Sequence, residues 1–300
     1  METEVAKQEL VAKERMAESG NFRTVYVLSV IVAVLATGVS LAGVCFPNLY
    51  LGNWGNGTAL GNDLVTLVVA VPALALAMIY SARGSVRARL LWLGTLYFMV
   101  YNYAFYVFGI PVTRLYLPWI CLFVCSGAAL ALGMGNLNVE SIAGRFSSRT
   151  PARWIAVFLL YSAAMISFLW ISQWVRFLGT GRAPDVNGSQ FAYQIIAAVD
   201  LSFMVPMQLS AAYLLFMRRP WGYVLGAVTL VQGAVYTAVM ATICVFGWML
   251  TPGSQLLSGW FINCVVSSIL CTVCLAGLLL GAKRPEITGS AARPRSYPHI

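Results

Sequence analysis

Long apolar runs separated by short polar segments dominate the hydrophobic pattern of this chain. The hydrocarbon core of a bilayer is about 30 Å thick, so a helix that crosses it needs about 20 mainly apolar residues. Eight runs meet this length, at residues 24–46, 64–80, 90–109, 116–134, 154–175, 191–217, 222–247 and 259–280. The alternation over about ten residues that is typical of membrane-spanning strands does not occur. The pattern predicts an all-α polytopic membrane protein with about eight transmembrane helices.

The runs divide the chain into a cytoplasmic N-terminal segment at 1–23, a transmembrane domain at 24–281 and a cytoplasmic C-terminal tail at 282–300. Orientation follows from Lys and Arg, because those residues near span ends resist translocation. All of them except Arg114, Arg176 and Arg182 lie on the side of the N-terminus. We therefore expect both termini to be cytoplasmic. One span more or fewer would destroy this asymmetry, which favours eight.

Composition supports lipid as the main solvent. Hydrophobic residues make up 60% of the chain and charged residues 10%, with a mean hydropathy of +0.78. These values exclude a water-soluble globule and an intrinsically disordered chain. The net charge of +9 lies in short clusters beside the spans, which favours contact with anionic lipid headgroups at the cytoplasmic face and argues against nucleic-acid binding.

Most motifs for known chemistry are absent from the sequence. The one histidine is His299, next to last in a polar tail, so the transmembrane domain has no Ser-His-Asp or Cys-His system and no histidine zinc site. A phosphate-binding Gly-Lys-Ser or Gly-Lys-Thr word does not occur either. We expect no cofactor and no metal, and the sequence leans away from an enzyme.

Two cysteine pairs leave a redox alternative open. Cys121 with Cys125 and Cys271 with Cys274 are spaced so that each pair shares a helix face. A membrane thiol-redox enzyme could use either pair. Packing is the stronger interpretation, since free cysteine behaves as a small buried hydrophobe.

Asp200 is the one acid well inside a predicted span. A carboxylate near the bilayer midplane is costly unless it is protonated, paired or facing a wet cavity, so such residues usually carry function. Asn102 and Gln232 lie at similar depth as candidate hydrogen-bond partners, Tyr193 as a residue lining the path and Asp63 as a residue at the outer mouth. We expect transport or sensing of a small solute, a cation or a proton through this polar site. The alternative is a neutral Asp200 that joins helices by a hydrogen bond.

A weak internal repeat links the two halves of the chain. Val71-Pro72 in the second run parallels Val205-Pro206 in the sixth, so the halves would be two parallel four-helix units. Small residues at 222 and 226, and at 277 and 281, are typical of close helix packing. They keep a structural or assembly protein, or a homo-oligomer, among the alternatives.

Four segments of the chain carry a family resemblance: Asn62-Asp63 and residues 90–94, 101–109 and 218–223. Together they resemble a family of uncharacterised bacterial multispan inner-membrane proteins. The resemblance implies a bacterial inner-membrane location over most of the chain from the second span onward. It implies no activity, cofactor or catalytic residue.

Overall fold

The computed structural model describes residues 2–46, 49–50, 58–147, 149–186, 190–250 and 259–282. In this part of the chain the regular elements are helices, and an isolated bridge pairs Phe146 with Ala282. In chain order they are α1 (Glu2–Cys45), α2 (Thr58–Val65), η3 (Thr66–Ala70), α3 (Val71–Ala82), α4 (Val86–Gly109), α5 (Tyr116–Gly135), α6 (Val139–Ala143), α7 (Ala152–Thr180), α8 (Gln190–Val199), η4 (Asp200–Met204), α9 (Val205–Phe216), α10 (Pro220–Leu250) and α11 (Gly259–Leu280).

Eight helical segments are long and apolar enough to cross a membrane, which confirms the predicted fold class. They are Phe22–Cys45, Thr58–Ala82, Val86–Gly109, Tyr116–Gly135, Ala152–Thr180, Gln190–Phe216, Pro220–Met249 and Gly259–Leu280. The backbone does not break at the predicted boundary after residue 23, because α1 continues from Glu2 into the first span. Most of the predicted C-terminal tail, from residue 283, lies outside the described residues.

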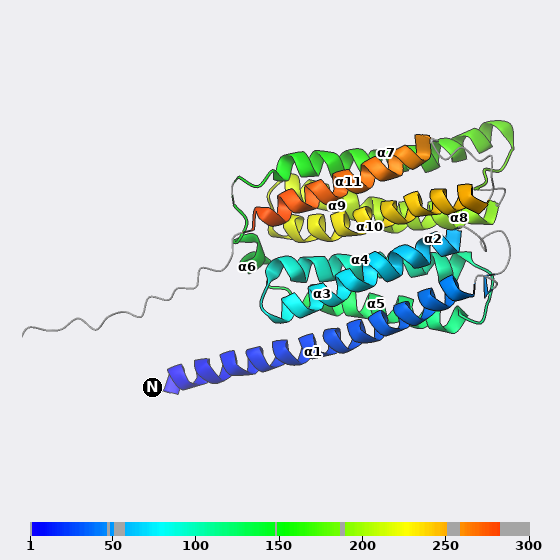
Figure 1. Cartoon of the computed structure of the whole chain (residues 1–300). Coiled ribbons are helices and arrows are strands. Elements are labelled where there is room, and N and C mark those ends of the chain that lie inside the picture. Colours follow the sequence, from blue (N-terminus) through cyan, green and yellow to red (C-terminus); the bar gives the residue numbers. More distant parts are fainter. Residues whose placement is uncertain are drawn as a thin grey trace, which may run out of the picture.

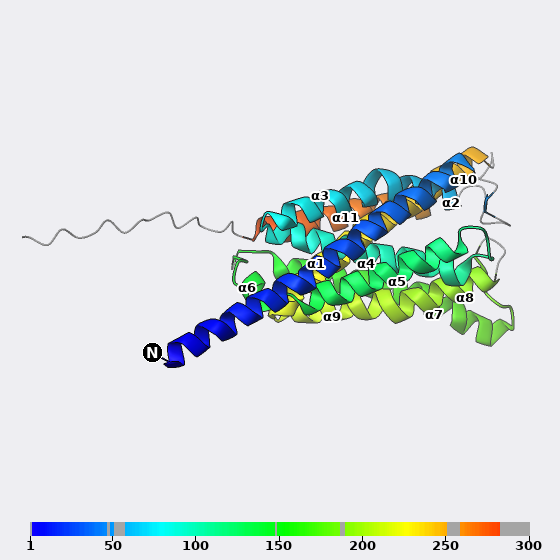
Figure 2. The ribbon, with the colours of Figure 1, turned by 90° about the horizontal axis from the view of Figure 1, so that it is seen from below.

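The first four spans lie beside the last four, and the two groups meet along α4 and α10 (Figure 1). From below, α1 runs diagonally across the bundle (Figure 2). α4 is the most buried of the spans and α11 the least. A close approach holds the two central helices together: a Cβ at Gly94 of α4 would lie 2.5 Å from Cβ of Val231 on α10. Glycine at this position therefore lets the two halves pack closely.

The second and sixth spans share a local irregularity. Each contains one π-helical turn, η3 or η4, after which the N–H of Val71 or Val205 donates to the carbonyl five residues earlier. Pro72 or Pro206 follows at once. Proline lacks an N–H and its ring clashes with the carbonyl four residues back, so a wider turn relieves the conflict. The shared feature supports the repeat predicted from the two Val-Pro words.

One end of the bundle carries the α3–α4 connection, α6 and the last turn of α11, and we call it the basic end. Here the guanidinium of Arg87 on α4 donates to the carbonyl of Ala282, just after α11. The N–H of Ser147 donates to the carbonyl of Gly281 at 2.9 Å. The first bond fixes the end of α11 against the start of α4, and the second fixes it against the segment after α6.

Candidate functional site

Asp200 is the first residue of η4, and its side chain is 5% exposed. It lies ten residues after the start of α8, which corresponds to about 15 Å along the helix axis. The backbone carbonyl of Asp200 accepts the hydrogen bond from Val205 that closes the π-turn. The acid is therefore placed at an irregular turn deep in the sixth span, as single π-turns often are at functional sites.

Both carboxyl oxygens of Asp200 have donors from other spans. The hydroxyl of Tyr101 on α4 donates to Oδ1, and Nε1–H of Trp170 on α7 donates to Oδ2 at 2.8 Å. Burying a carboxyl is tolerable when its oxygens accept hydrogen bonds. The side chain of Asp200 thus joins three spans, and a fourth span, α10, contacts Tyr101 through an aromatic ring.

Aromatic rings surround these hydrogen bonds. Tyr101 meets Tyr236 of α10 edge-on, with ring centroids 4.9 Å apart, and meets Phe105 at 5.0 Å. Trp170 meets Tyr193 edge-on at 5.5 Å, and the Tyr193 hydroxyl donates to the Trp170 carbonyl at 3.0 Å. Tyr193 therefore touches the site through Trp170 and not through the acid itself.

A surface groove of about 320 Å³ lies between α7 and α8, behind Trp170. Tyr193, Trp174 and Leu201 are among its lining residues, but Asp200 is not. Trp170 therefore both lines this groove and donates to the carboxyl of Asp200.

The other predicted site residues fall into different surroundings. Asn102 accepts a hydrogen bond from Asn62 of α2 at 2.7 Å instead of contacting Asp200. Gln232 is fully buried on α10, one helical turn before Tyr236, and neither atom of its amide has a hydrogen-bond partner in the described structure. The predicted group around Asp200 is thus only partly brought together.

Sequence reasoning missed Tyr101 and Trp170, the two donors to Asp200. The aromatic residues of α4 surround the helix, so their spacing alone does not show which ring faces the acid. Trp170 resembles the interfacial tryptophans of other spans, yet it is only 7% exposed. Its depth, ten residues before the end of α7, was the available signal against an interfacial role.

Asp63 forms a second buried acid site, in the first half of the bundle. Its carboxyl is 2% exposed and accepts a hydrogen bond from the Tyr50 hydroxyl at 2.5 Å. The side chains of Ser40 and Tyr106 also face this carboxyl. Instead of lying at an open outer mouth, Asp63 packs inside the core, about 7.5 Å along the axis from the start of α2.

The fit around Asp63 depends on Gly43 of α1, because a Cβ there would overlap the Asp63 carboxyl and the Tyr50 hydroxyl. The Tyr50 ring stacks on Trp119 of α5 with centroids 6.0 Å apart. Burial raises the pKa of the Tyr50 phenol above its ordinary value of 10.0, and the negative charge of Asp63 raises it further. Tyr50 therefore keeps its proton and remains a donor to the acid.

Three consecutive residues of α4 connect the two acid sites. Tyr101 bonds to Asp200, Asn102 bonds to Asn62, and the Tyr103 phenol lies near Asp63. Successive residues of a helix point about 100° apart, so a single turn of α4 faces both halves of the bundle.

The cysteine pairs show no redox arrangement in the described residues. All seven cysteines are free thiols, and Cys271 is buried whereas Cys121 is exposed. No group of three His, Cys, Asp or Glu residues in the described ranges has the placement to hold a metal ion. A thiol-redox role for either pair stays a prediction.

Comparison with known proteins gives no relative: no family model, no curated protein and no solved structure matches this chain.

Proposed function

We propose that this multi-pass membrane protein moves or senses a small solute, a cation or a proton, and that Asp200 is the group whose proton or bound cation changes. One observation carries the proposal. The carboxyl of Asp200 is held by donors from two other spans at a π-turn. A change at this carboxyl therefore alters contacts among α4, α7 and η4 at the same time.

The chemistry of the two donors makes this network sensitive to charge. An ionised carboxylate only accepts hydrogen bonds, whereas a protonated one must also donate. The indole N–H of Trp170 can only donate, so a proton on Oδ2 would weaken that bond, because a neutral oxygen is a poorer acceptor than an ionised one. A tyrosine hydroxyl can donate or accept, so Tyr101 can reverse its role. Gain of a proton or of a cation thus favours a different packing of α7 against η4.

The test uses purified protein in vesicles that enclose a pH-sensitive dye, with Na⁺ or K⁺ gradients across the membrane. We expect proton movement that Asp200→Asn reduces to the rate of protein-free vesicles. Glu140→Gln is the matched control, because it makes the same change at an exposed acid of α6 and should keep the wild-type rate. A correctly folded Asp200→Asn protein with the wild-type rate would overturn the proposal.

A sensor that does not conduct needs a second readout. Ion binding or protonation at Asp200 would change the environment of Trp170, so we expect a tryptophan fluorescence change with pH or with Na⁺ or K⁺. Trp170→Phe should remove this change. A wild-type protein with neither ion movement nor such a fluorescence change would also contradict the proposal.

A structural role is the second candidate, and two observations favour it. Both oxygens of Asp200 already have donors, and Asp200 does not line the nearby groove. In that case Asp200→Asn lowers stability, and ion-dependent signals are absent from the wild type too.

For location we propose the bacterial inner membrane, with both termini in the cytoplasm. The strong excess of Lys and Arg on the side of the N-terminus supports the orientation. The four segments that resemble bacterial inner-membrane proteins support the location. Reporter fusions at each terminus that are active only in the cytoplasm test the orientation.

A further inference from the structure

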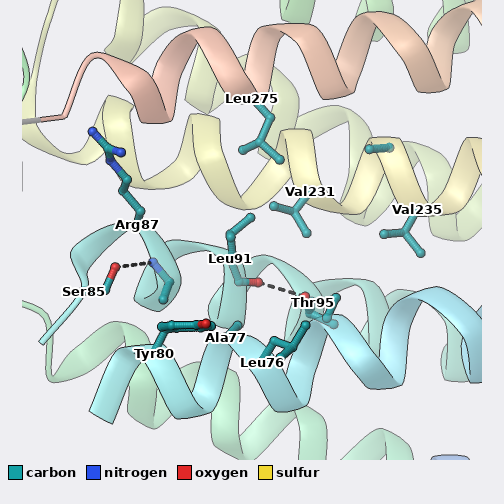
Figure 3. Close-up of a pocket in the computed structure, with 13 residues that line it drawn as sticks. Leu76, Ala77, Tyr80, Ser85, Arg87, Leu91, Thr95, Val231, Val235 and Leu275 are labelled. Carbon is teal, nitrogen blue, oxygen red and sulfur yellow. Dashed lines mark hydrogen bonds between the residues drawn. The ribbon is translucent and has the colours of Figure 1, made fainter. Parts of the chain in front are cut away.

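An apolar groove of about 440 Å³ runs between the two halves of the bundle on the side of α3 and α11 (Figure 3). We call it the α3–α11 groove. Its lining residues include Leu76 and Tyr80 of α3, Arg87 and Leu91 of α4, Val235 of α10 and Leu275 of α11. The volume falls within the range of small-molecule and lipid-chain sites.

The groove has one polar end and one apolar end. Figure 3 shows Arg87 and Ser85 at one end and Thr95 and Val235 at the other. Thr95 lies eight residues beyond Arg87 on α4, which is about 12 Å deeper along the axis. The polar end therefore belongs at headgroup level, and the rest lies within the apolar segments of four spans.

Positive charge gathers at the polar end. The Arg87 guanidinium is half-buried and uses one N–H on the Ala282 carbonyl, and a guanidinium has five such donors. Arg83 lies over the Tyr80 ring at 5.3 Å from its centroid, which holds a second cation beside the groove. The first turn of α4, capped by Ser85, adds the positive end of a helix dipole.

We propose that the α3–α11 groove binds an anionic phospholipid, with an acyl chain between α3 and α11 and the phosphate on Arg87 and Arg83. Two features argue for this occupant. The apolar walls belong to four membrane-spanning segments, where an acyl chain is the natural apolar partner, and the charge at the polar end complements an anionic headgroup. Since the walls come from both halves, the bound lipid also packs α3 and α4 against α10 and α11.

The experiment titrates the full purified chain in neutral detergent with phosphatidylglycerol, with phosphatidylcholine of the same chain length and with inorganic phosphate. Native mass spectrometry counts the bound lipid, and thermal unfolding gives Tm. We expect phosphatidylglycerol to bind about 25-fold more tightly than phosphatidylcholine, because each of the two arginines near the headgroup provides about fivefold, and to raise Tm. Inorganic phosphate should leave Tm unchanged.

Two pairs of variants locate the site. Arg87→Gln should weaken phosphatidylglycerol binding about fivefold, and Arg149→Gln, at an exposed arginine of the same end, should not. Ala73→Phe fills the groove from its half-buried wall and should weaken binding of both lipids. Ala75→Phe, on the exposed face of α3, should leave binding unchanged.

Three results would overturn the proposal. They are equal binding of the two lipids that Arg87→Gln does not alter, wild-type binding by Ala73→Phe, and a Tm increase with inorganic phosphate as large as with phosphatidylglycerol. Should Arg87→Gln fail to fold because it loses the bond to Ala282, Ala73→Phe still decides, since it keeps that bond.

Discussion

Replacing Trp170 by Phe removes the indole N–H that donates a hydrogen bond to Oδ2 of Asp200, with a donor–acceptor distance of 2.8 Å. A hydrogen bond to an ionised group contributes about 1.5–3 kcal/mol to stability. Interhelical hydrogen bonds in a membrane protein average only about 0.6 kcal/mol. The energy of this one bond therefore tells whether Asp200 carries the charge that ion handling requires, or is a neutral link between helices.

The single variant also loses ring contacts with Tyr193, so a double-mutant cycle is needed. Trp170→Phe, Asp200→Leu and their combination are compared with the wild type by the free energy of unfolding in mixed micelles titrated with SDS. We expect a coupling energy of about 1.5–3 kcal/mol. Trp174→Phe, one turn further along α7 and 52% exposed, is the control and should show no coupling to Asp200→Leu.

A coupling energy near 0.6 kcal/mol, about the average for a membrane hydrogen bond, would refute the argument for an ionised Asp200. The structural role would then explain the site. A coupling energy near zero would mean that Trp170 does not donate to the acid at all.

Two further predictions concern the first half of the bundle. Gly43→Ala should lower the free energy of unfolding by about 1–3 kcal/mol, because the new Cβ overlaps the Asp63 carboxyl, whereas Gly38→Ala, with nothing within 4 Å, should not destabilise. SDS unfolding measures both, and equal effects would contradict the packing described at Gly43. The raised pKa of Tyr50 predicts that its stabilising contribution is present below its ordinary value of 10.0 and is lost as pH rises above it, because the unfolded chain then ionises first. The stability difference between wild type and Tyr50→Phe should therefore shrink between pH 9 and pH 11, and a constant difference would contradict the burial of that phenol.

The spans were predictable because span length is a local property of the sequence. The spans predicted at 90–109 and 116–134 correspond to the helices Val86–Gly109 and Tyr116–Gly135. Ends shifted most in the second span, where polar residues extend the helix to Thr58–Ala82 although apolarity alone predicted 64–80. The same happens at the end of Ala152–Thr180, predicted at 154–175.

The sequence predicted the depth of the site along its span, but it did not predict which side chains of the neighbouring helices face Asp200. Asp200 stood out because it is an acid far inside a span, and the structure does converge other spans on it. Its partner on α4 is Tyr101 and not the adjacent Asn102, a difference of one residue and about 100° of rotation. Apolar periodicity cannot fix that rotation on a helix that is buried all round. The hydrophobic pattern could not predict the π-turns either, because they depend on how the backbone adapts to Pro72 and Pro206.

The polar turn at residues 101–103 gives α4 a mechanical role. A helix that is hydrogen-bonded to neighbours on opposite sides cannot rotate about its own axis without disturbing the contacts on both sides. A small rotation of α4 that relaxed Tyr101 away from Asp200 would drag Tyr103 across Asp63 and pull Asn102 from Asn62. We therefore expect the two acid sites to be coupled through rotation of α4, so that a change at one site reaches the other without the movement of a loop.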